Sequence, residues 1–190
     1  MNHNLPYLLI DDDFSLNLSI VALLLFKLSF SSKGNALLDF DKLQIFLYLV
    51  KNPSKINPML ALAGKKLSPI KPQYTFTIDS LSSNVDILFD RSKLKSLLKH
   101  MAARGMLECD KFTDPKSLKY YLSQAGIRFT EGLMDLSSGS ATEDSERSNV
   151  NAHDNIYFKA LLDVAESLIP LQTQPNTKLN SYLNTIFKGI

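Results

Sequence analysis

Three consecutive carboxylates, Asp11, Asp12 and Asp13, form the densest group of potential metal ligands in this chain of 190 residues. Consecutive residues do not easily converge on one ion, and no second Asp, Glu or His motif is spaced to join them. An N-terminal cap, in contrast, needs only one acceptor side chain directly before a helix. We therefore predict that the three aspartates form the polar approach and cap of a helix near Leu16, rather than a metal site.

Other residues capable of nucleophilic, ligating or phosphate-binding chemistry are isolated from one another. His3, His100 and His153 lie far apart with no Cys or His at ligand spacing, and no Gly-x-Ser-x-Gly elbow is present. The Gly-Lys-Lys sequence at 64–66 lacks the upstream glycine and the following Ser or Thr of a phosphate-binding loop. The sequence therefore predicts no catalytic residue, cofactor, metal or small-molecule substrate.

Positive charge is concentrated in one part of the chain. The formal net charge is only +2, but nine Lys or Arg residues lie between Arg91 and Arg128, against three carboxylates. Such an excess is typical of a surface that meets a phosphate backbone or an acidic protein. The alternative is a solvated face with no ligand. The predicted contacts to nucleic acid or to an acidic partner are Arg91, Lys93, Lys95, Lys99, Arg104, Lys116 and Lys119.

The element that must position most of these cations is a helix from Asp90 to Gly105. Its apolar residues recur at i, i+3, i+4 and i+7, which is one face of a helix with 3.6 residues per turn. Asp90 is placed to cap this helix, and Gly105 to end it in the left-handed conformation. The residues of the apolar face are Leu94, Leu97, Leu98 and Met101. His100 adds one more polar residue to the opposite face.

A hairpin and a second helix follow the basic helix. Residues 106–112 and 117–122 have strand character, with a turn at 113–116 that contains Pro115. In the second strand Leu118, Tyr120 and Leu122 alternate with polar or amphipathic residues, as on a half-buried strand. Ser123 can cap the next helix, whose apolar face carries Phe129, Leu133 and Leu136. This order predicts a winged helix-turn-helix core.

Segments upstream complete the expected fold, which is mainly α with a small β-sheet. Asp39 opens a helix that stops at Asn52-Pro53, and a short third helix begins with proline at its first position, Asn57-Pro58, and ends near Gly64. Residues 74–78 alternate as in a short strand that would join the hairpin. Residues 82–89 are ambiguous, and a helix there would complete the helix-turn-helix.

The segment 16–30 is apolar on several sides, with an unbroken apolar run at 20–26 that is too short to span a membrane. A helix of this kind must be buried on more than one side. Two interpretations stay open, namely the core of this chain or an interface with another chain. For the second, the predicted contact residues are Leu16, Ile20 and Leu24.

The C-terminal part changes character twice. Residues 137–153 are rich in Ser, Gly, Asn and acidic side chains and predict a flexible acidic linker. Two amphipathic helices at 154–190 must then dock on this chain or on a partner. Their predicted partner contacts are Leu161, Leu168, Leu183 and Phe187. The expected organisation is a winged-helix domain with an N-terminal helical extension at 1–136, the linker, and a C-terminal helical pair.

Bulk composition agrees with an ordinary folded protein. A hydrophobic fraction of 45% with 21% charged residues excludes wholesale disorder. The single cysteine, Cys109, excludes an internal disulfide, and we expect it to pack as a small apolar residue. The first residues lack the features of a signal peptide. We therefore expect a cytoplasmic protein.

Three passages in order resemble one known family. These are residues 13–20 (DFSLNLSI), residues 38–53, which begin LDFDKLQIF and end KNP, and residues 120–126 (YYLSQAG). Together they resemble the middle component of bacterial ABC three-component systems, a group that includes the small third subunit of Lamassu-type defence complexes. The resemblance covers residues 10–135, and its last passage is common to winged helices at large.

The resemblance implies a non-catalytic adaptor with two protein partners, an SMC-like ATPase subunit and an effector subunit, often a nuclease. The adaptor would join the effector to the ATPase heads and support DNA sensing in immunity against phage or plasmid. A stand-alone winged-helix DNA-binding transcriptional regulator is the second hypothesis. An enzyme with dispersed site residues is the third.

Overall fold

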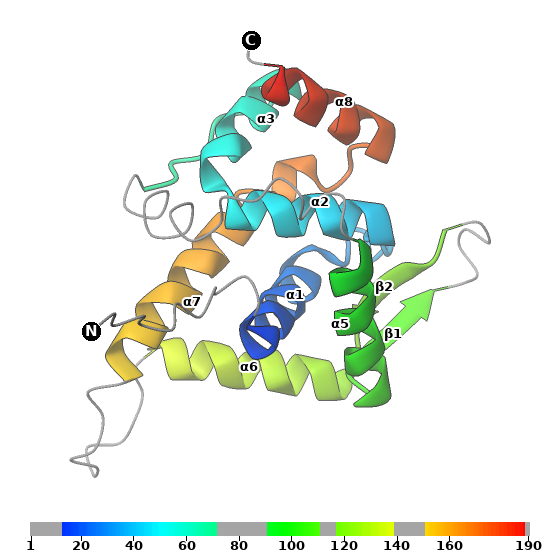
Figure 1. Ribbon diagram of the computed structural model, residues 1–190, viewed down its shortest axis with the longest axis vertical. Coiled ribbons are helices and arrows are strands. Elements are labelled where there is room, and N and C mark those ends of the chain that lie inside the picture. The colour runs from blue at the N-terminus through cyan, green and yellow to red at the C-terminus, as the bar shows by residue number, and fades with distance from the viewer. Residues whose placement is uncertain (1–12, 72–90, 111–116, 139–150, 189–190) are drawn as a thin grey trace, which may run out of the picture.

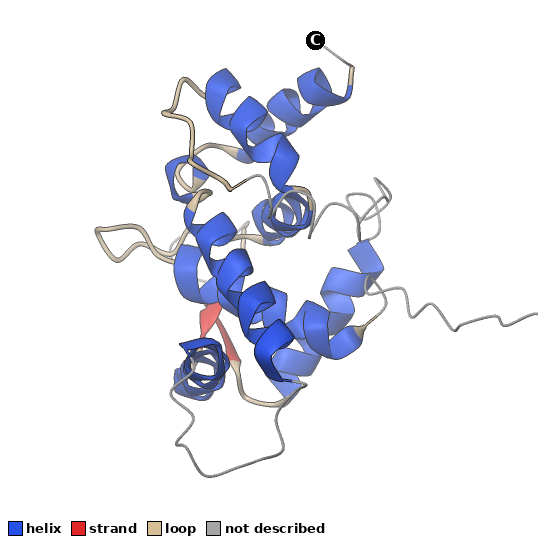
Figure 2. Cartoon of the chain, turned by 90° about the vertical axis from the view of Figure 1, so that its left-hand side faces the viewer, coloured by secondary structure: helices blue, strands red, loops and turns tan. Residues whose placement is uncertain are grey.

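The computed structural model of the chain describes residues 13–71, 91–110, 117–138 and 151–188. These residues are mainly helical, with one small antiparallel sheet, as the sequence predicts (Figures 1 and 2). The α-helices are α1 (Phe14–Leu28), α2 (Phe40–Lys51), α3 (Ile56–Leu62), α5 (Arg91–Ala103), α6 (Gln124–Ser138), α7 (Asn151–Glu166) and α8 (Asn176–Phe187). The strands are β1 (Leu107–Asp110) and β2 (Lys119–Leu122), and short 3₁₀ turns lie at Pro53–Lys55 and Ile169–Leu171.

Helix α1 is surrounded by other elements of the chain: it packs against α2, α5, α6, α7 and β2 (Figure 1). The Asp13 carboxylate begins it by accepting hydrogen bonds from the backbone N–H groups of Ser15 and Leu16, at 2.8 and 3.1 Å, which confirms the predicted cap. Ile20 and Leu24 are almost fully buried in the core of this chain. Of the two interpretations of this helix, the intrachain core is the one that the structure shows.

Helix α2 begins and ends as predicted. The Asp39 carboxylate accepts a hydrogen bond from the Lys42 N–H at 2.9 Å, and the helix ends at Lys51, with Asn52 as its C-cap and Pro53 following. Helix α3 differs from the prediction, since it begins at Ile56, so Pro58 is its third residue instead of its first. The 3₁₀ turn before it supplies the helical entry that the sequence prediction assigned to proline.

Helix α5 and the hairpin follow one another as predicted. The predicted apolar face of α5 is buried, and Gly105 has a φ of +66° at its end. Leu107 pairs with Leu122 and Asp110 with Lys119 at the two ends of the hairpin. On the other edge of β2, the Tyr120 N–H donates to the carbonyl oxygen of Leu38 at 2.7 Å. The hairpin is thereby joined to the segment that leads into α2.

Two predictions about the hairpin are wrong. Leu118, expected to face the core, is 41% exposed, and Lys119, expected at the surface, is half-buried, whereas Tyr120 and Leu122 pack against the core as predicted. Cys109 is exposed, since it lies in a two-stranded ribbon too narrow to cover it. The expected strand at 74–78, the segment 82–89, the capping residue Asp90 and the turn at 113–116 lie outside the described residues.

The C-terminal helices dock on this chain. Helix α7 packs against α6 and α1, and α8 packs against α3 and α2. Helix α6 extends to Ser138 and helix α7 begins at Asn151, so both ends of the predicted linker are helical. Leu161, Leu168 and Leu183 lie in the same hydrophobic cluster as α1 and α2. Within the described ranges, no helix is long and apolar enough to cross a membrane.

Candidate functional site

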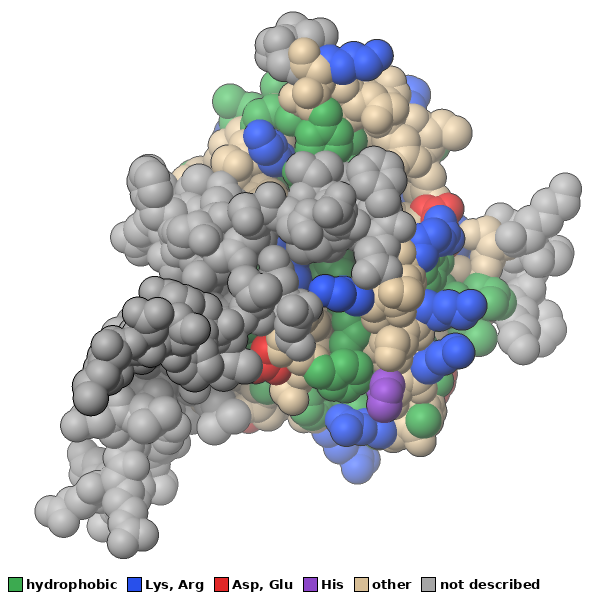
Figure 3. Space-filling model, viewed as in Figure 1, with side chains coloured by type: hydrophobic (Ala, Val, Ile, Leu, Met, Phe, Trp, Pro, Cys, Tyr) green, Lys and Arg blue, Asp and Glu red, His purple; other side chains and the backbone are tan. Residues whose placement is uncertain are grey.

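The outer side of α5 carries the largest group of predicted site residues. Its buried side packs on α1 and β1, so the remaining side faces solvent. We use the name basic face of α5 for Arg91, Lys93, Lys95 and Lys99 together with Arg104, which directly follows the helix; all five are exposed. Figure 3 shows Lys and Arg side chains gathered over this helix. Five of the seven predicted cations are therefore exposed on or directly after α5; Arg91, Lys95 and Lys99 follow one another at i, i+4 and i+8, whereas Lys93 and Arg104 lie further round the helix.

Three cations of this face are available for a ligand. Within the part of the chain that the structure describes, Lys95, Lys99 and Arg104 have no ion-pair partner. Lys95 and Lys99 belong to a helix that is anchored in the core, and Arg104 directly follows it, so the backbone that carries these charges is held in place. Such a surface can attract phosphate or carboxylate groups without a rearrangement of the backbone.

Arg91, at the start of α5, is already engaged. A guanidinium nitrogen lies 2.7 Å from a carboxylate oxygen of Asp41, and the guanidinium carbon lies 4.5 Å from the centre of the Phe40 ring. Both side chains of the ion pair are more than half exposed, so the pair stabilises the fold by at most about 1 kcal/mol. Its main consequence is geometric, since it fixes the N-terminus of α5 beside α2.

His100 is exposed on α5, in agreement with its predicted role as a polar residue of this helix. The ring of Phe14 meets it edge to face, with 4.7 Å between the ring centres. Phe14 is itself 38% exposed. The contact places an aromatic ring from the start of α1 beside the basic face, which periodicity in the sequence could not indicate because the two residues are far apart.

Lys119 is not part of this surface, although the sequence placed it there. Its ammonium group lies 2.8 Å from a carboxylate oxygen of Asp39 and 3.2 Å from the Ser117 hydroxyl, and only 17% of its side chain is exposed. The reason is that β2 turns this side chain toward the N-terminus of α2. Lys116, the other predicted cation of the hairpin, lies outside the described residues.

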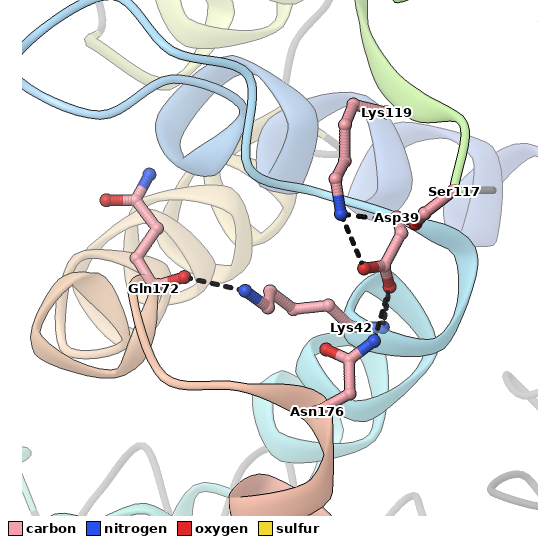
Figure 4. Close-up of polar contacts among 6 residues, drawn as sticks. All are labelled: Asp39, Lys42, Ser117, Lys119, Gln172 and Asn176. Atoms are coloured by element: carbon pink, nitrogen blue, oxygen red, sulfur yellow. Dashed lines mark hydrogen bonds and ion pairs between the residues drawn. The ribbon is translucent and has the colours of Figure 1, made fainter. Parts of the chain in front are cut away.

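Lys119 belongs to a buried polar network, which Figure 4 shows. We use the name Asp39 network for Asp39, Lys42, Ser117, Lys119, Gln172 and Asn176. Asn176 donates to Asp39 at 2.8 Å, and the Lys42 ammonium donates to the carbonyl oxygen of Gln172 at 3.0 Å. The Gln172 amide in turn donates to the carbonyl oxygens of Leu28 and Phe30. The network joins α2 to β2, to the end of α1 and to the segment between α7 and α8.

Burial alone would raise the pKa of Asp39, but hydrogen bonds from Lys119, the Lys42 backbone and Asn176 outweigh it, so the pKa lies below its ordinary value of 3.8. Burial lowers the pKa of Lys42 from 10.5, with Asp39 opposing and Lys119 reinforcing the shift. Asp39 is therefore ionised at neutral pH. These shifts follow from a structural role, since each charge is paired or hydrogen-bonded within the fold.

The described part of the hairpin is acidic on one strand. Glu108 and Asp110 are on β1, opposite Tyr121 and Lys119 of β2. Partial burial raises the pKa of Tyr121, and the negative charges of Glu108 and Asp110 raise it further. In the described residues of the hairpin, Lys119 is the only cation, and Asp39 neutralises it. The described part of the hairpin therefore adds no unpaired positive charge to that of α5.

The predicted apolar contacts to partners lie mostly inside the fold. Ile20, Leu24, Leu161, Leu168 and Leu183 are buried, Leu16 is half-buried, and Phe187 is 39% exposed. Periodicity identified their apolar faces correctly, but it could not tell docking on this chain from docking on another. The exposed large apolar residues that sequence reasoning missed are Phe14, Phe30, Leu62, Leu67, Leu118 and Ile169. They follow no periodic pattern.

Metal ligation finds no support in the described ranges, where no three His, Cys, Asp or Glu side chains cluster closely enough to hold an ion. Asp11 and Asp12 lie outside these ranges. The Asp13 carboxylate instead caps α1.

The segment that holds α5, the hairpin and α6 is also the segment that is similar to a known family. Residues 28–137 match the family described as ABC-three component (ABC-3C) system Middle Component 4. The chain belongs to this family. The match confirms the resemblance seen in the sequence, and it covers more than half of this middle component, from the end of α1 through α6. No curated protein and no solved structure matched.

Proposed function

We propose that this middle component is a non-catalytic adaptor that joins an effector, such as a nuclease, to the heads of an SMC-like ATPase. Membership of a three-component system implies protein partners. The basic face of α5 is the contact to a polyanionic surface, either DNA sensed by the complex or an acidic face of a partner. The biological setting that we propose is defence against phage or plasmid in the cytoplasm, as in Lamassu-type complexes.

The observation that carries the proposal is the set of exposed cations on and directly after α5 that have no ion-pair partner in the described residues, namely Lys95, Lys99 and Arg104. Elsewhere the chain neutralises cations near its core, as the pair of Lys119 with Asp39 demonstrates. Exposed lysines elsewhere, such as Lys65 and Lys178, also lack an ion-pair partner among the described residues, so it is the concentration of cations along one anchored helix that supports an external anion as their ligand. A solvated face remains the alternative that an experiment must exclude.

The arrangement of elements supports a winged-helix core for this adaptor. Helix α5 precedes the β1–β2 hairpin, and α6 begins directly after it. The Leu38 carbonyl bonds to the free edge of β2 and so adds a further extended segment beside the hairpin. Ser123 closes the unit, since its hydroxyl donates to the Gly105 carbonyl and accepts from the Gly126 N–H.

The charges of the hairpin favour the adaptor over the stand-alone regulator. A DNA-reading winged helix uses cations of the hairpin on the phosphate backbone beside its helix. Here Lys119 is engaged by Asp39, and β1 presents Glu108 and Asp110. These carboxylates would repel a backbone that lies against the described part of the hairpin.

The test is a charge reversal of Lys95, Lys99 and Arg104 to Glu, in the protein assembled with the other two components of its system. We expect assembly or DNA retention by the complex to fail. If phosphates are the ligand, the slope of log binding constant against log salt concentration should become shallower by about three. The matched control reverses three exposed cations elsewhere, Lys65, Lys66 and Lys178. Unchanged assembly and unchanged DNA retention in the α5 variant would refute the proposal.

A further inference from the structure

A groove lies between α2 and α8, beside the N-terminus of α5. It encloses about 220 Å³, which is smaller than the roughly 300–1,000 Å³ of most small-molecule sites. Its lining combines buried apolar residues, three side-chain amides and one ion pair. A space of this size suits one or two side chains of a protein ligand better than a cofactor.

One wall of the groove has a regular spacing of amide groups. Asn180 and Asn184 lie one turn apart on α8, both are exposed, and in the described residues neither side chain has a hydrogen-bond partner. Positions i and i+4 of a helix are separated by about 6 Å along the axis. Alternate residues of an extended peptide are separated by about 6.6–6.8 Å. Each carboxamide can both donate and accept, so the pair can bond to successive peptide groups on one edge of such a strand.

The floor of the groove is apolar. Ile45 of α2 and Leu183 of α8 are buried there, and Phe187 stands at the rim with 39% of its surface exposed. The Tyr48 ring supports Phe187 edge to face, at 5.8 Å between ring centres. An aromatic ring that is held in place but left accessible is the kind of residue that anchors a partner side chain.

The opposite end of the groove holds the ion pair of Arg91 with Asp41. Arg91 is paired with Asp41, yet 63% of its side chain is exposed, and its five N–H groups exceed what one carboxylate oxygen can use. Lys95 follows one turn later on the same side of α5 and has no ion-pair partner among the described residues. A carboxylate of a bound segment could accept from the Arg91 N–H groups that Asp41 does not use and, beyond the groove itself, approach Lys95.

We propose that this groove binds an extended peptide segment of another component of the system. The segment would bond to Asn180 and Asn184 through its backbone, place an apolar side chain against Phe187, and direct a carboxylate to Arg91 and Lys95. The inference rests on the proposed adaptor function, since it names one of the contacts through which the adaptor would hold its partner.

The experiment uses fluorescence anisotropy to measure binding of the full chain to short overlapping peptides that span the other two components. We expect at least one peptide with an apolar residue and a nearby acid to bind, and its affinity to fall about tenfold in the Asn180→Ala, Asn184→Ala variant. Ser181→Ala with Lys178→Ala is the matched control, because both residues are exposed on α8 and do not line the groove.

Three results would overturn the inference. The first is that no peptide binds, and the second is that the control variant loses binding as much as the asparagine variant does. The third is that the chain self-associates and the asparagine variant abolishes this self-association, because the groove would then hold a second copy of the chain. If the three components still assemble in an α5-dependent way, the adaptor function survives a failure of the groove. Peptide binding that depends on the asparagines, with no dependence of assembly on α5, would support the groove and refute the role of the basic face.

Discussion

Replacement of Asp39 by Ala should destabilise the fold more than replacement of any exposed carboxylate. The change removes the cap of α2, which is worth about 1 kcal/mol, and leaves Lys119 largely buried without its counterion, which costs about 3–5 kcal/mol. One carboxylate makes both interactions, and they are therefore not additive. We expect a loss of about 3–5 kcal/mol in the free energy of unfolding.

Two further variants separate these contributions. Asp39→Asn keeps an oxygen that can accept from the Lys42 N–H, so it should retain the cap and lose only the ion pair. Asp41→Ala is the matched control, two residues along the chain, because its pair with Arg91 is mostly exposed and should contribute less than about 1 kcal/mol.

The assay is urea-induced unfolding at neutral pH, followed by far-ultraviolet circular dichroism. The midpoint should move furthest for Asp39→Ala, less for Asp39→Asn and least for Asp41→Ala. If Asp39→Ala lay within about 1 kcal/mol of the parent, the Asp39 network would not hold these elements together, and the argument from burial would be wrong.

Three other expectations concern stability. Because the pKa of Asp39 is lowered in the fold, this carboxylate stabilises the fold at pH values above its ordinary pKa of 3.8, and the stabilisation is lost as the pH falls through the lowered pKa. The free energy of unfolding should therefore fall more steeply with decreasing pH for the parent than for Asp39→Asn. Gly126→Ala should destabilise the fold by about 1–3 kcal/mol, since a methyl group would collide with the Met106 carbonyl. Gly132→Ala on the same helix meets open space and should stabilise the fold by up to about 1 kcal/mol. Thermal melts should therefore show a lower melting temperature for the first variant and a higher one for the second. Leu24→Asp should prevent folding, and a soluble, cooperatively melting variant would contradict the burial of α1.

Local interactions explain most of what could be predicted from the sequence. Asp13 and Asp39 cap helices through bonds that span two or three residues, and Gly105 ends α5 through its own backbone conformation. The apolar face of α5 follows from helical geometry alone. Such features depend on neighbours in the chain, so spacing is enough to find them.

Long-range contacts explain what could not be predicted. Lys119 was expected on the surface, because alternation in β2 cannot show that Asp39, 80 positions earlier, would neutralise it. For Leu168 and Leu183, docking on this chain and docking on a partner both stayed open, since an apolar helical face does not indicate which protein covers it; the structure buries both residues in this chain. The groove beside Asn180 also needs three helices that are distant in sequence. All three cases concern the identity of the contacting segment, whereas most elements that lie within the described residues are where the sequence predicts them.

The most direct test of the adaptor is a co-purification of the other two components with and without this chain. The two components are expressed together, one of them is captured by a tag, and the recovery of the other is measured in the presence of the parent protein or of the variant with Lys95, Lys99 and Arg104 changed to Glu. The adaptor account predicts that both components are recovered together only when the parent chain is present. Equal recovery in its absence would contradict the account.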